Sequence, residues 1–383
     1  MICDAPVDGL RELCSRHSRG TIVSRVADGL PEWVVDKGRL RHASADYFSI
    51  GMYSHGQAET LLLMEQKETA LVALFAARVD GRDAVLLSLR TEPGLIGLTN
   101  FSSTIQSTPS NYLRRHGGKS TPFMQIAANP GAYGRVAYDG MQYDWGDYYL
   151  HKTKRFLIVE LDSPVEAPRG FCWVPLEMAQ TLLCEDNLVT NDLRVAIPLL
   201  SVRQRRDAVC PNVACSQDQG ATLSNLAYSL GAVDCRGVAV SFFRMTSDTR
   251  EVSSWVQPLV TPTGVMKISL PFIRTPTGRL YAVDKRTQPG LLGRQLWFPS
   301  TSQGGRVARK VRSSAEGGRF WRFPIEIEAV DMTPVSGVAC SEVAEGLWMP
   351  EDALSLLIAQ SCETSLELRM AWSLVCFGGM DAA

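Results

Sequence analysis

Two stretches of the sequence hold side chains whose types and spacing could perform chemistry. The first covers residues 90–118 and reads RTEPGLIGLTNFSSTIQSTPSNYLRRHGG, with short hydrogen-bonding groups behind a Pro-Gly turn. Such groups suit a polyhydroxylated or heterocyclic ligand, in which each polar atom needs a partner. Taken singly, each is more typical of a turn, so a binding loop and an ordinary turn both stay open. The residues concerned are Thr104, Gln106, Ser110, Asn111 and Tyr112.

The end of the same stretch is basic. Arg114, Arg115 and His116 could contact phosphate oxygens, because charged donors bind phosphate strongly. A solvated basic turn explains the same spacing more simply, so phosphate binding is one of two interpretations.

The second stretch, QYDWGDYYLHK at residues 142–152, brings Asp144, Asp147 and His151 close together in sequence. Removing a proton next to a carbonyl needs a base, and expelling hydroxide needs an acid. Carboxylate, imidazole and phenol groups are all present here. The alternative is that the aspartates form a turn before a strand.

No standard catalytic signature accompanies these residues. The sequence contains no P-loop, GxSxG, HExxH or dinucleotide GxGxxG motif. Its ten cysteines form no CxxC pair, and Cys210 and Cys215 lie five apart with no histidine nearby. We therefore expect no metal site and free, mostly buried thiols.

Part of the first stretch recurs. RTQPGLLGRQLWFPSTSQGG, at residues 286–305, repeats the Arg-Thr-x-Pro-Gly turn and a later Ser-Thr-x-Gln, but lacks Ser-Asn-Tyr. GDYYLHKTKRFLIVEL has a counterpart in GGRFWRFPIEIEAV, and CWVPLEMAQTLL in LWMPEDALSLLI. Such a long period indicates two duplicated domains rather than a solenoid. All five histidines fall in the first half, so we place the competent site there.

These residues must be positioned by a mixed α and β framework. Apolar runs predict strands at residues 83–90 and 155–161, with counterparts at 279–286 and 323–330. Each copy should then form a helix with Pro175 or Pro350 in its first position. A further helix, over residues 187–200, should close the first half. The prediction is an α+β fold with two tandem domains: residues 1–200 with the site, a linker at 201–225, and residues 226–383 as an eroded structural copy, to which the family resemblance described below adds the α/β/α architecture and a role in dimerisation.

Composition agrees with a two-domain globular protein. The 383 residues are 45% hydrophobic and 21% charged, with a net charge of −1, so nothing draws the whole chain to nucleic acid or a membrane. The opening MICDAPVDGLREL does not resemble a secretory signal, and no apolar run approaches the ~20 residues that span a bilayer. We expect a cytoplasmic protein.

The sequence also resembles the NDP-hexose 2,3-dehydratase family of deoxysugar biosynthesis. The resemblance rests on SSTIQSTPSNYLRRHGG, FCWVPLEMAQTLLCEDNLVTNDLR, HASADYFSI and WVQPLV, which occur in the family's order over most of the chain. It implies tandem Nudix-like α/β/α domains, a homodimer, and loss of water across C2 and C3 of a dTDP-4-keto-6-deoxyhexose. It implies no cofactor, because the 4-ketone itself accepts the electrons, and no Nudix box of acidic residues is found here.

The resemblance also carries site residues over by position. Arg90 stands where the family has Lys, and Asp144 where it has Glu. We predict that Asp144 transfers the proton, with Tyr112 and His116 assisting. The predicted substrate-binding residues are Arg90, Glu92, Thr104, Gln106, Ser110, Asn111, Arg114, Gln142, Lys152 and Arg155.

Departures from the family pattern leave three hypotheses open. The first is the dehydratase itself. The second keeps the scaffold for a dehydratase, isomerase or cyclase acting on another biosynthetic intermediate. The third is a non-catalytic partner protein.

Overall fold

The structure is a computed structural model. It describes residues 2–27, 31–43, 47–55, 59–115, 118–204, 223–250, 252–301, 304–333, 346–360 and 362–377. Within these ranges the chain is mixed α+β, with several sheets and few helices. Most of the expected linker, together with His116, lies outside the described residues.

A central sheet organises the first half of the chain. Its strand order is β10-β12-β6-β7-β13, with β12 and β6 parallel and the other neighbours antiparallel. Apolar residues fill β6 and β12 because both are covered on their two faces. Two short strands extend this sheet, β8 on β7 and β9 on β6. The bounds are β6 Ala70–Val79, β7 Arg82–Thr91, β8 Thr99–Ser102, β9 Ile105–Ser107, β10 Gly134–Tyr143, β12 Thr153–Leu161 and β13 Phe171–Pro175.

A second sheet repeats this arrangement strand by strand. β20-β21-β17-β18 have the same order and directions as β10-β12-β6-β7, and β22 pairs with β18 as β13 pairs with β7. Irregularities fall at the matching places, between Val136 and Tyr138 and between Val307 and Arg309. The four strands predicted from sequence are β7, β12, β18 and β21. The bounds are β17 Met266–Thr275, β18 Gly278–Thr287, β19 Gln295–Pro299, β20 Arg306–Ser314, β21 Pro324–Asp331 and β22 Leu347–Pro350.

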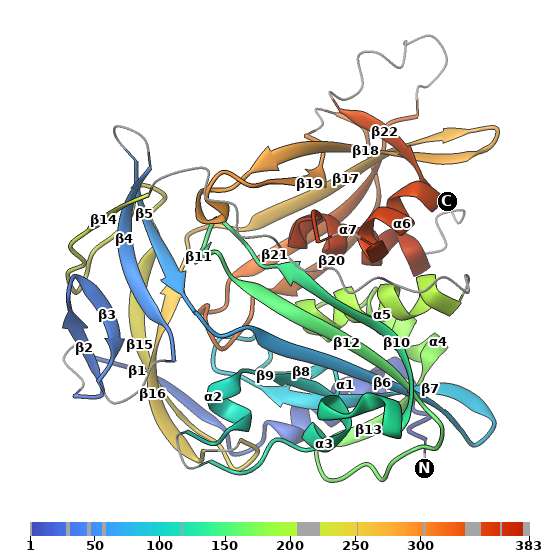
Figure 1. Cartoon of the computed structure of the whole chain (residues 1–383), viewed down its shortest axis with the longest axis horizontal. Helices are drawn as coiled ribbons and strands as arrows, with labels where there is room; N and C mark the ends of the chain where they lie inside the picture. Colours follow the sequence, from blue (N-terminus) through green and yellow to red (C-terminus); the bar gives the residue numbers. More distant parts are fainter. Residues whose placement is uncertain are drawn as a thin grey trace.

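Helices of the two halves pack against one another between the two sheets (Figure 1). They are α5 Asn191–Gln204 of the first half and α6 Glu351–Gln360 and α7 Leu366–Phe377 of the second, whereas α4 Leu176–Leu182 packs against β7 and β13. Pro175 and Pro350 end strands β13 and β22, so the helices begin one residue later than predicted. The helix expected from residue 187 begins at Asn191, because the backbone of Leu188 and Thr190 bonds instead to Phe101 of β8.

Smaller sheets join the ends of the two halves. One has the order β11-β5-β4-β3-β2, with β14 on β4; the other is β1-β15-β16. Because β1 belongs to the first half and its neighbour β15 to the second, pairing crosses the expected domain boundary, and β14, at the end of the expected linker, pairs with β4 of the first half. The bounds are β1 Ile22–Val26, β2 Trp33–Asp36, β3 Arg39–His42, β4 Ser49–His55, β5 Glu59–Glu65, β11 Tyr149–Leu150, β14 Ser224–Leu226, β15 Ala239–Thr246 and β16 Ser254–Thr261. The remaining short elements are α1 Val7–His17, α2 Pro109–Tyr112, α3 Met124–Ala128, η1 Pro130–Ala132 and η2 Pro289–Leu291.

The repeated Pro-Gly turns meet the opposite halves reciprocally. The Gly94 N–H donates to Gly317 O (2.9 Å), and the Gly290 N–H donates to Gly146 O (2.7 Å). A Cβ atom on Gly94 would lie 1.6 Å from Phe320 O, and one on Gly290 would lie 1.8 Å from Tyr149 O. The close backbone approach therefore requires glycine at both turns, which we call the reciprocal turns (residues 92–95 and 288–291).

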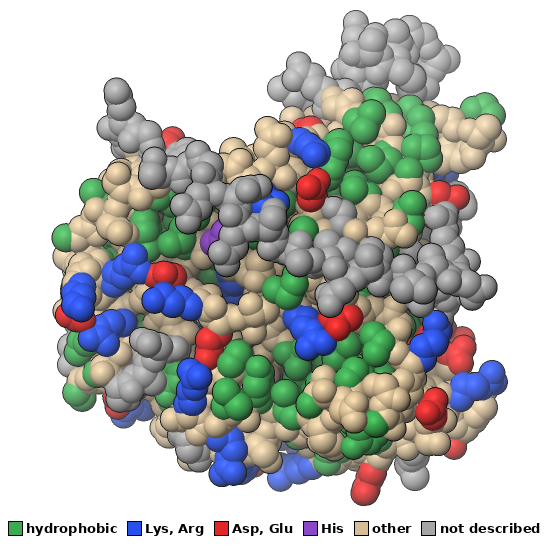
Figure 2. Space-filling model, in the orientation of Figure 1, with side chains coloured by type: hydrophobic (Ala, Val, Ile, Leu, Met, Phe, Trp, Pro, Cys, Tyr) green, Lys and Arg blue, Asp and Glu red, His purple; other side chains and the backbone are tan. Residues whose placement is uncertain are grey.

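The surface and the cysteines carry less information about function. Basic and acidic side chains are interspersed on the face shown in Figure 2. None of the described helices is long and apolar enough to span a membrane. The seven cysteines within the described ranges are free: Cys14 and Cys362 are buried, four others are partly buried and Cys235 is exposed, so only two of these thiols are fully buried. Cys210, Cys215 and Cys340 lie outside it.

Candidate active site

A cavity of about 250 Å³ lies where the first-half sheet and the N-terminal strands meet two parts of the second half, namely β16 with the residues before it and the turn at residues 316–319. Five of the predicted substrate-binding residues line it, and each comes from β7, β9, α2 or the turn between β7 and β8. These five are Arg90, Glu92, Gln106, Ser110 and Asn111. The polar stretch is therefore folded around a cavity.

One wall of the cavity is aromatic. Trp33 and Phe48 pack with their ring centroids 5.0 Å apart, and the Trp33 indole donates to Val256 O (3.0 Å). The Arg319 guanidinium carbon lies 4.1 Å from the centroid of the Phe48 ring, and Trp255 lines the same cavity. Such a wall offers both a flat apolar surface and cationic groups.

Arg90 also holds the start of the polar stretch, residues 90–118, in place. The Arg90 side chain, 16% exposed, forms an ion pair with Glu92 (2.6 Å) and donates to Gln106 O (2.8 Å). Glu92 in turn accepts from the Gly318 N–H of the second half (2.9 Å). These contacts hold the reciprocal turn and the polar loop in one arrangement.

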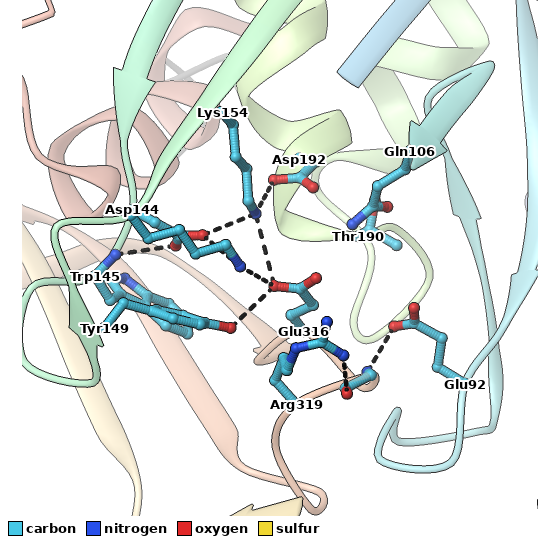
Figure 3. A network of polar contacts seen from close by, with 12 residues as sticks. Glu92, Gln106, Asp144, Trp145, Tyr149, Lys154, Thr190, Asp192, Glu316 and Arg319 are labelled. Atoms are coloured by element: carbon cyan, nitrogen blue, oxygen red, sulfur yellow. Dashed lines mark hydrogen bonds and ion pairs between the residues drawn. The ribbon is translucent and has the colours of Figure 1, made fainter. Parts of the chain in front are cut away.

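A group of charged side chains also borders the cavity, and Figure 3 shows how its members approach one another. The Lys154 ammonium lies 2.8 Å from Asp192 Oδ1, 3.1 Å from Asp144 Oδ2 and 3.8 Å from Glu316 Oε2. Lys152 lies 3.2 Å from both Asp144 Oδ2 and Glu316 Oε2. We call Asp144, Lys152, Lys154, Asp192 and Glu316 the charge cluster; it contains three carboxylates and two ammonium groups.

The carboxylates of the charge cluster differ in their pKa values. For Asp144, burial raises the pKa, but Lys154 and Lys152 outweigh burial and hold it below its usual range. The same lysines with Arg319 and Arg90 hold the pKa of Glu316 well below its usual range. For Asp192, burial is the largest influence, and with Glu316 and Asp144 nearby it raises the pKa despite Lys154. Asp192 is thus the carboxylate of this cluster that binds a proton most readily.

Other predicted residues serve other contacts in the structure. Asp144, only 4% exposed, does not line the main cavity and lies at a smaller one of about 20 Å³ next to the cluster. Lys152 is likewise buried, below the ring of Tyr149. Thr104 bridges two strands, donating to Leu86 O and accepting from the Phe75 N–H.

Four further predicted residues are not brought to the main cavity. The Gln142 side chain bonds to Tyr138 and Arg369 in the protein interior. Arg155 pairs with Asp139, and Arg114 donates to Gly118 O. Tyr112 of α2 does not line the cavity either. Their roles in binding or proton transfer stay predictions.

Sequence reasoning missed Lys154, Asp192 and Glu316 as cavity residues. Asp192 lies within EDNLVTNDLR, one of the stretches that carried the family resemblance, and Glu316 immediately precedes the repeated Gly-Gly-Arg-Phe. The family stretch around Asp192 and the repeat after Glu316 can both be recognised in the sequence. The contact of Glu316 with a first-half cavity, however, depends on how the two halves pack together.

In the second half, the position that corresponds to Lys154 is apolar. Strand register places Ser313 opposite Ile325 as it places Gln142 opposite Lys154, so Ile325 occupies the position of Lys154. A separate cavity of about 450 Å³ in the second half is lined by Asp147, Gln288 and Glu367 among others. Its chemistry therefore differs from that of the charge cluster.

Comparison with known proteins agrees with the family resemblance. Residues 15–200 match the model of the family NDP-hexose 2,3-dehydratase. The chain is 31% identical over 273 residues to a dTDP-4-dehydro-6-deoxy-alpha-D-glucopyranose 2,3-dehydratase of Streptomyces violaceoruber, covering 61% of each chain. Proteins of the same name from Saccharopolyspora spinosa and Amycolatopsis orientalis are 25% identical over 294 residues and 26% over 262.

The match to the Saccharopolyspora protein covers 63% of this chain and 60% of the relative, and that to the Amycolatopsis protein covers 58% and 54%. The matched region thus spans about three-fifths or less of each relative's length. The family model falls on the half that carries most of the cavity and four of the five residues of the charge cluster. Through residues 15–200, the chain is similar to the NDP-hexose 2,3-dehydratase family.

Proposed function

We propose that the protein is a carbon–oxygen lyase that removes water across C2 and C3 of a dTDP-4-keto-6-deoxyhexose. The observation that carries the proposal is the lining of the main cavity, which combines aromatic and arginine side chains with Lys154, Asp192 and Glu316 of the charge cluster. The names of the relatives supply the substrate class.

Each part of such a substrate has a matching surface. The thymine ring suits the wall of Trp33, Phe48 and Trp255, and Arg90 and Arg319 suit the diphosphate. The keto sugar then reaches the charge cluster. The Lys154 ammonium there can stabilise negative charge that develops on the C4 oxygen when the C3 proton is removed. The reaction needs no external oxidant, because the electrons of the C3–H bond stay within the sugar.

The finer structural predictions belong to the same proposal. The matched strand orders and reciprocal turns support an internal duplication, with residues 1–200 and 226–383 as Nudix-like α/β/α domains. The family resemblance supports a cytoplasmic homodimer. Light scattering on the purified protein would contradict the dimer if it gave the mass of one chain.

Turnover of dTDP-4-keto-6-deoxyglucose tests the activity. We expect mass spectrometry to show loss of one water, and release of dTDP as the diketone breaks down. Trp33→Ala should weaken stabilisation by dTDP in a thermal-shift assay, whereas Tyr133→Ala, on an exposed loop, should leave it unchanged. Absence of turnover with several dTDP-4-keto sugars would contradict the proposal, and absence of any dTDP effect would favour a different intermediate as substrate.

A further inference from the structure

We infer that Asp192, rather than Asp144, is the base that removes the C3 proton of the sugar. The inference deepens the proposed function and rests on it. Asp192 lies in the first turn of α5 and lines both the main cavity and the small one beside it.

The free oxygen of Asp192 is the first argument. The residue is 2% exposed, and its Oδ1 accepts from Lys154 (2.8 Å). Its Oδ2 is buried without a hydrogen-bond partner among the described residues. In Figure 3 this second oxygen points away from Lys154. A buried carboxylate oxygen without a partner is costly, so one that borders a cavity is suited to a ligand.

Competing carboxylates are committed to other contacts. Asp144 Oδ2 also lacks a hydrogen-bond partner among the described residues, but it forms ion pairs with Lys152 (3.2 Å) and Lys154 (3.1 Å), and Asp144 Oδ1 accepts from the Trp145 N–H. Glu316 Oε2 accepts from Tyr149 (3.1 Å) and Lys152 (3.2 Å). These ion pairs keep Asp144 and Glu316 ionised. Both carboxylates are therefore better suited to neutralising the lysine charges than to accepting a proton.

The pKa directions agree with the geometry. A base must bind a proton, and the pKa of Asp192 is raised by burial, whereas the surrounding lysines lower the pKa values of Asp144 and Glu316. As the pH is lowered, kcat/KM should therefore begin to decrease at a pH above the pKa of an ordinary aspartate. The facing groups that set this limb are Lys154, Asp144 and Glu316.

One carboxylate on one face can complete the reaction. The Asp192 carboxylate takes the C3 proton, and the C–H electrons form the C3–C4 enolate. The enolate then re-forms the C4 carbonyl and a C2–C3 double bond, expelling the C2 hydroxyl, which takes the proton back from Asp192 and leaves as water. In a gluco sugar O2 and O3 lie on opposite faces, so the C3 hydrogen and O2 share a face. The resulting enol tautomerises to the 3,4-diketone.

Matched Asp→Asn variants test the assignment. Asp192→Asn keeps an oxygen that can accept from Lys154 but removes the base. We expect at least a roughly 10³-fold fall in kcat, no exchange of the C3 hydrogen with D₂O, and unchanged thermal stabilisation by dTDP. Asp144→Asn should reduce activity less and keep the acidic limb of the pH profile. Asp162→Asn, on an exposed loop, is the control and should behave as wild type.

The outcomes separate the two proposals. Turnover by Asp192→Asn within about tenfold of wild type would overturn the base assignment and leave the dehydratase intact. Loss of C3 exchange in Asp144→Asn but not in Asp192→Asn would do the same and return the role to Asp144. A wild-type protein that neither dehydrates nor exchanges the C3 hydrogen of any dTDP-4-keto sugar would overturn both.

Discussion

Lys154 approaches three carboxylates within 4 Å, and its ammonium is buried with them. Burial alone would lower the pKa of Lys154, but Asp144, Asp192 and Glu316 raise it well above its ordinary value. The ammonium is therefore a permanent positive charge within the charge cluster. The stability of the folded protein depends on this charge, because burying carboxylates without a partner is costly in free energy.

Replacing Lys154 by Met should destabilise the protein by about 3–5 kcal/mol at pH 8, because Asp192 would lose its cation. The loss should be smaller at pH 5.5. The pKa of Asp192, already raised, would rise further, so a larger share of the group is neutral at low pH and the penalty shrinks as pH falls. Urea unfolding at both pH values measures this. Lys310→Met removes an exposed cation of β20 that pairs with Glu326 and Glu328, and it should cost much less stability than Lys154→Met at either pH, because solvent screens such pairs. Equal losses for both variants would contradict the role given to Lys154.

At this scale the sequence predicted much of the polar loop and little of the charge cluster. Arg90, Glu92, Gln106, Ser110 and Asn111 are close in sequence, so one stretch was enough to group them. The residues of the charge cluster come from three distant segments of the chain. The spacing of residues in the sequence does not indicate that Asp192 or Glu316 lies close to Lys154. Only the packed structure supplies that distance.

Among the elements, the reciprocal turns decide how the two halves meet. Besides the Gly94 and Gly290 bonds, the Arg322 N–H donates to Gly94 O (2.8 Å) and the His151 N–H to Gly290 O (2.7 Å). Each turn is thus bonded twice to the same hairpin of the other half. The pattern explains why Arg-Thr-x-Pro-Gly recurs in the sequence although the side chains that follow it do not.

Alanine at Gly94 or Gly290 should destabilise the protein by more than about 3 kcal/mol, because each Cβ would overlap a carbonyl oxygen. Gly94→Ala should also weaken ligand binding, since its turn carries Glu92 of the cavity. Thermal unfolding with and without dTDP measures both effects. Gly131→Ala is the matched control, since no atom lies within 4 Å of its added Cβ. Wild-type melting of Gly94→Ala would show that the turns do not pack as described.

The elements themselves were more predictable than their contacts. The apolar runs at β7, β12, β18 and β21 identified strands correctly, because buried strands impose their own composition. Helix starts were off by one residue at Leu176 and Glu351, where the preceding proline ends a strand instead. Proline is tolerated both at the end of an edge strand and at the first position of a helix, so the local sequence could not decide between these two positions.

For the whole molecule, the important feature is that the halves share sheets as well as an interface. β1 of the first half pairs with β15 of the second, and β14 pairs with β4. Helix α5 packs against α6 and α7, and Glu316 of the second half enters the first-half cavity. A boundary drawn from the sequence repeat therefore does not separate the contacts.

Residues 1–200 expressed alone should not fold to a native state. Without the second half, β1 lacks its neighbour and the buried face of α5, with Leu193, Ile197 and Leu200, is exposed. We expect aggregation or loss of near-ultraviolet circular dichroism, and recovery of dTDP binding when residues 201–383 are co-expressed. The full chain serves as the reference. A monomeric fragment that unfolds cooperatively and binds dTDP as well as the full chain would contradict this expectation.

The reciprocal turns also limit how such a chain can be inherited. Each half carries a backbone surface that fits only the matching turn of the other, with carbonyl oxygens where an added Cβ would lie. Recombination that exchanged one half for that of a distant relative would bring together turns and hairpins with separate histories. The two halves should therefore pass between genes as one unit. Chimeras joined near residue 210 should lose stability in proportion to mismatches at residues 92–95, 146–151, 288–291 and 317–322, rather than to overall divergence.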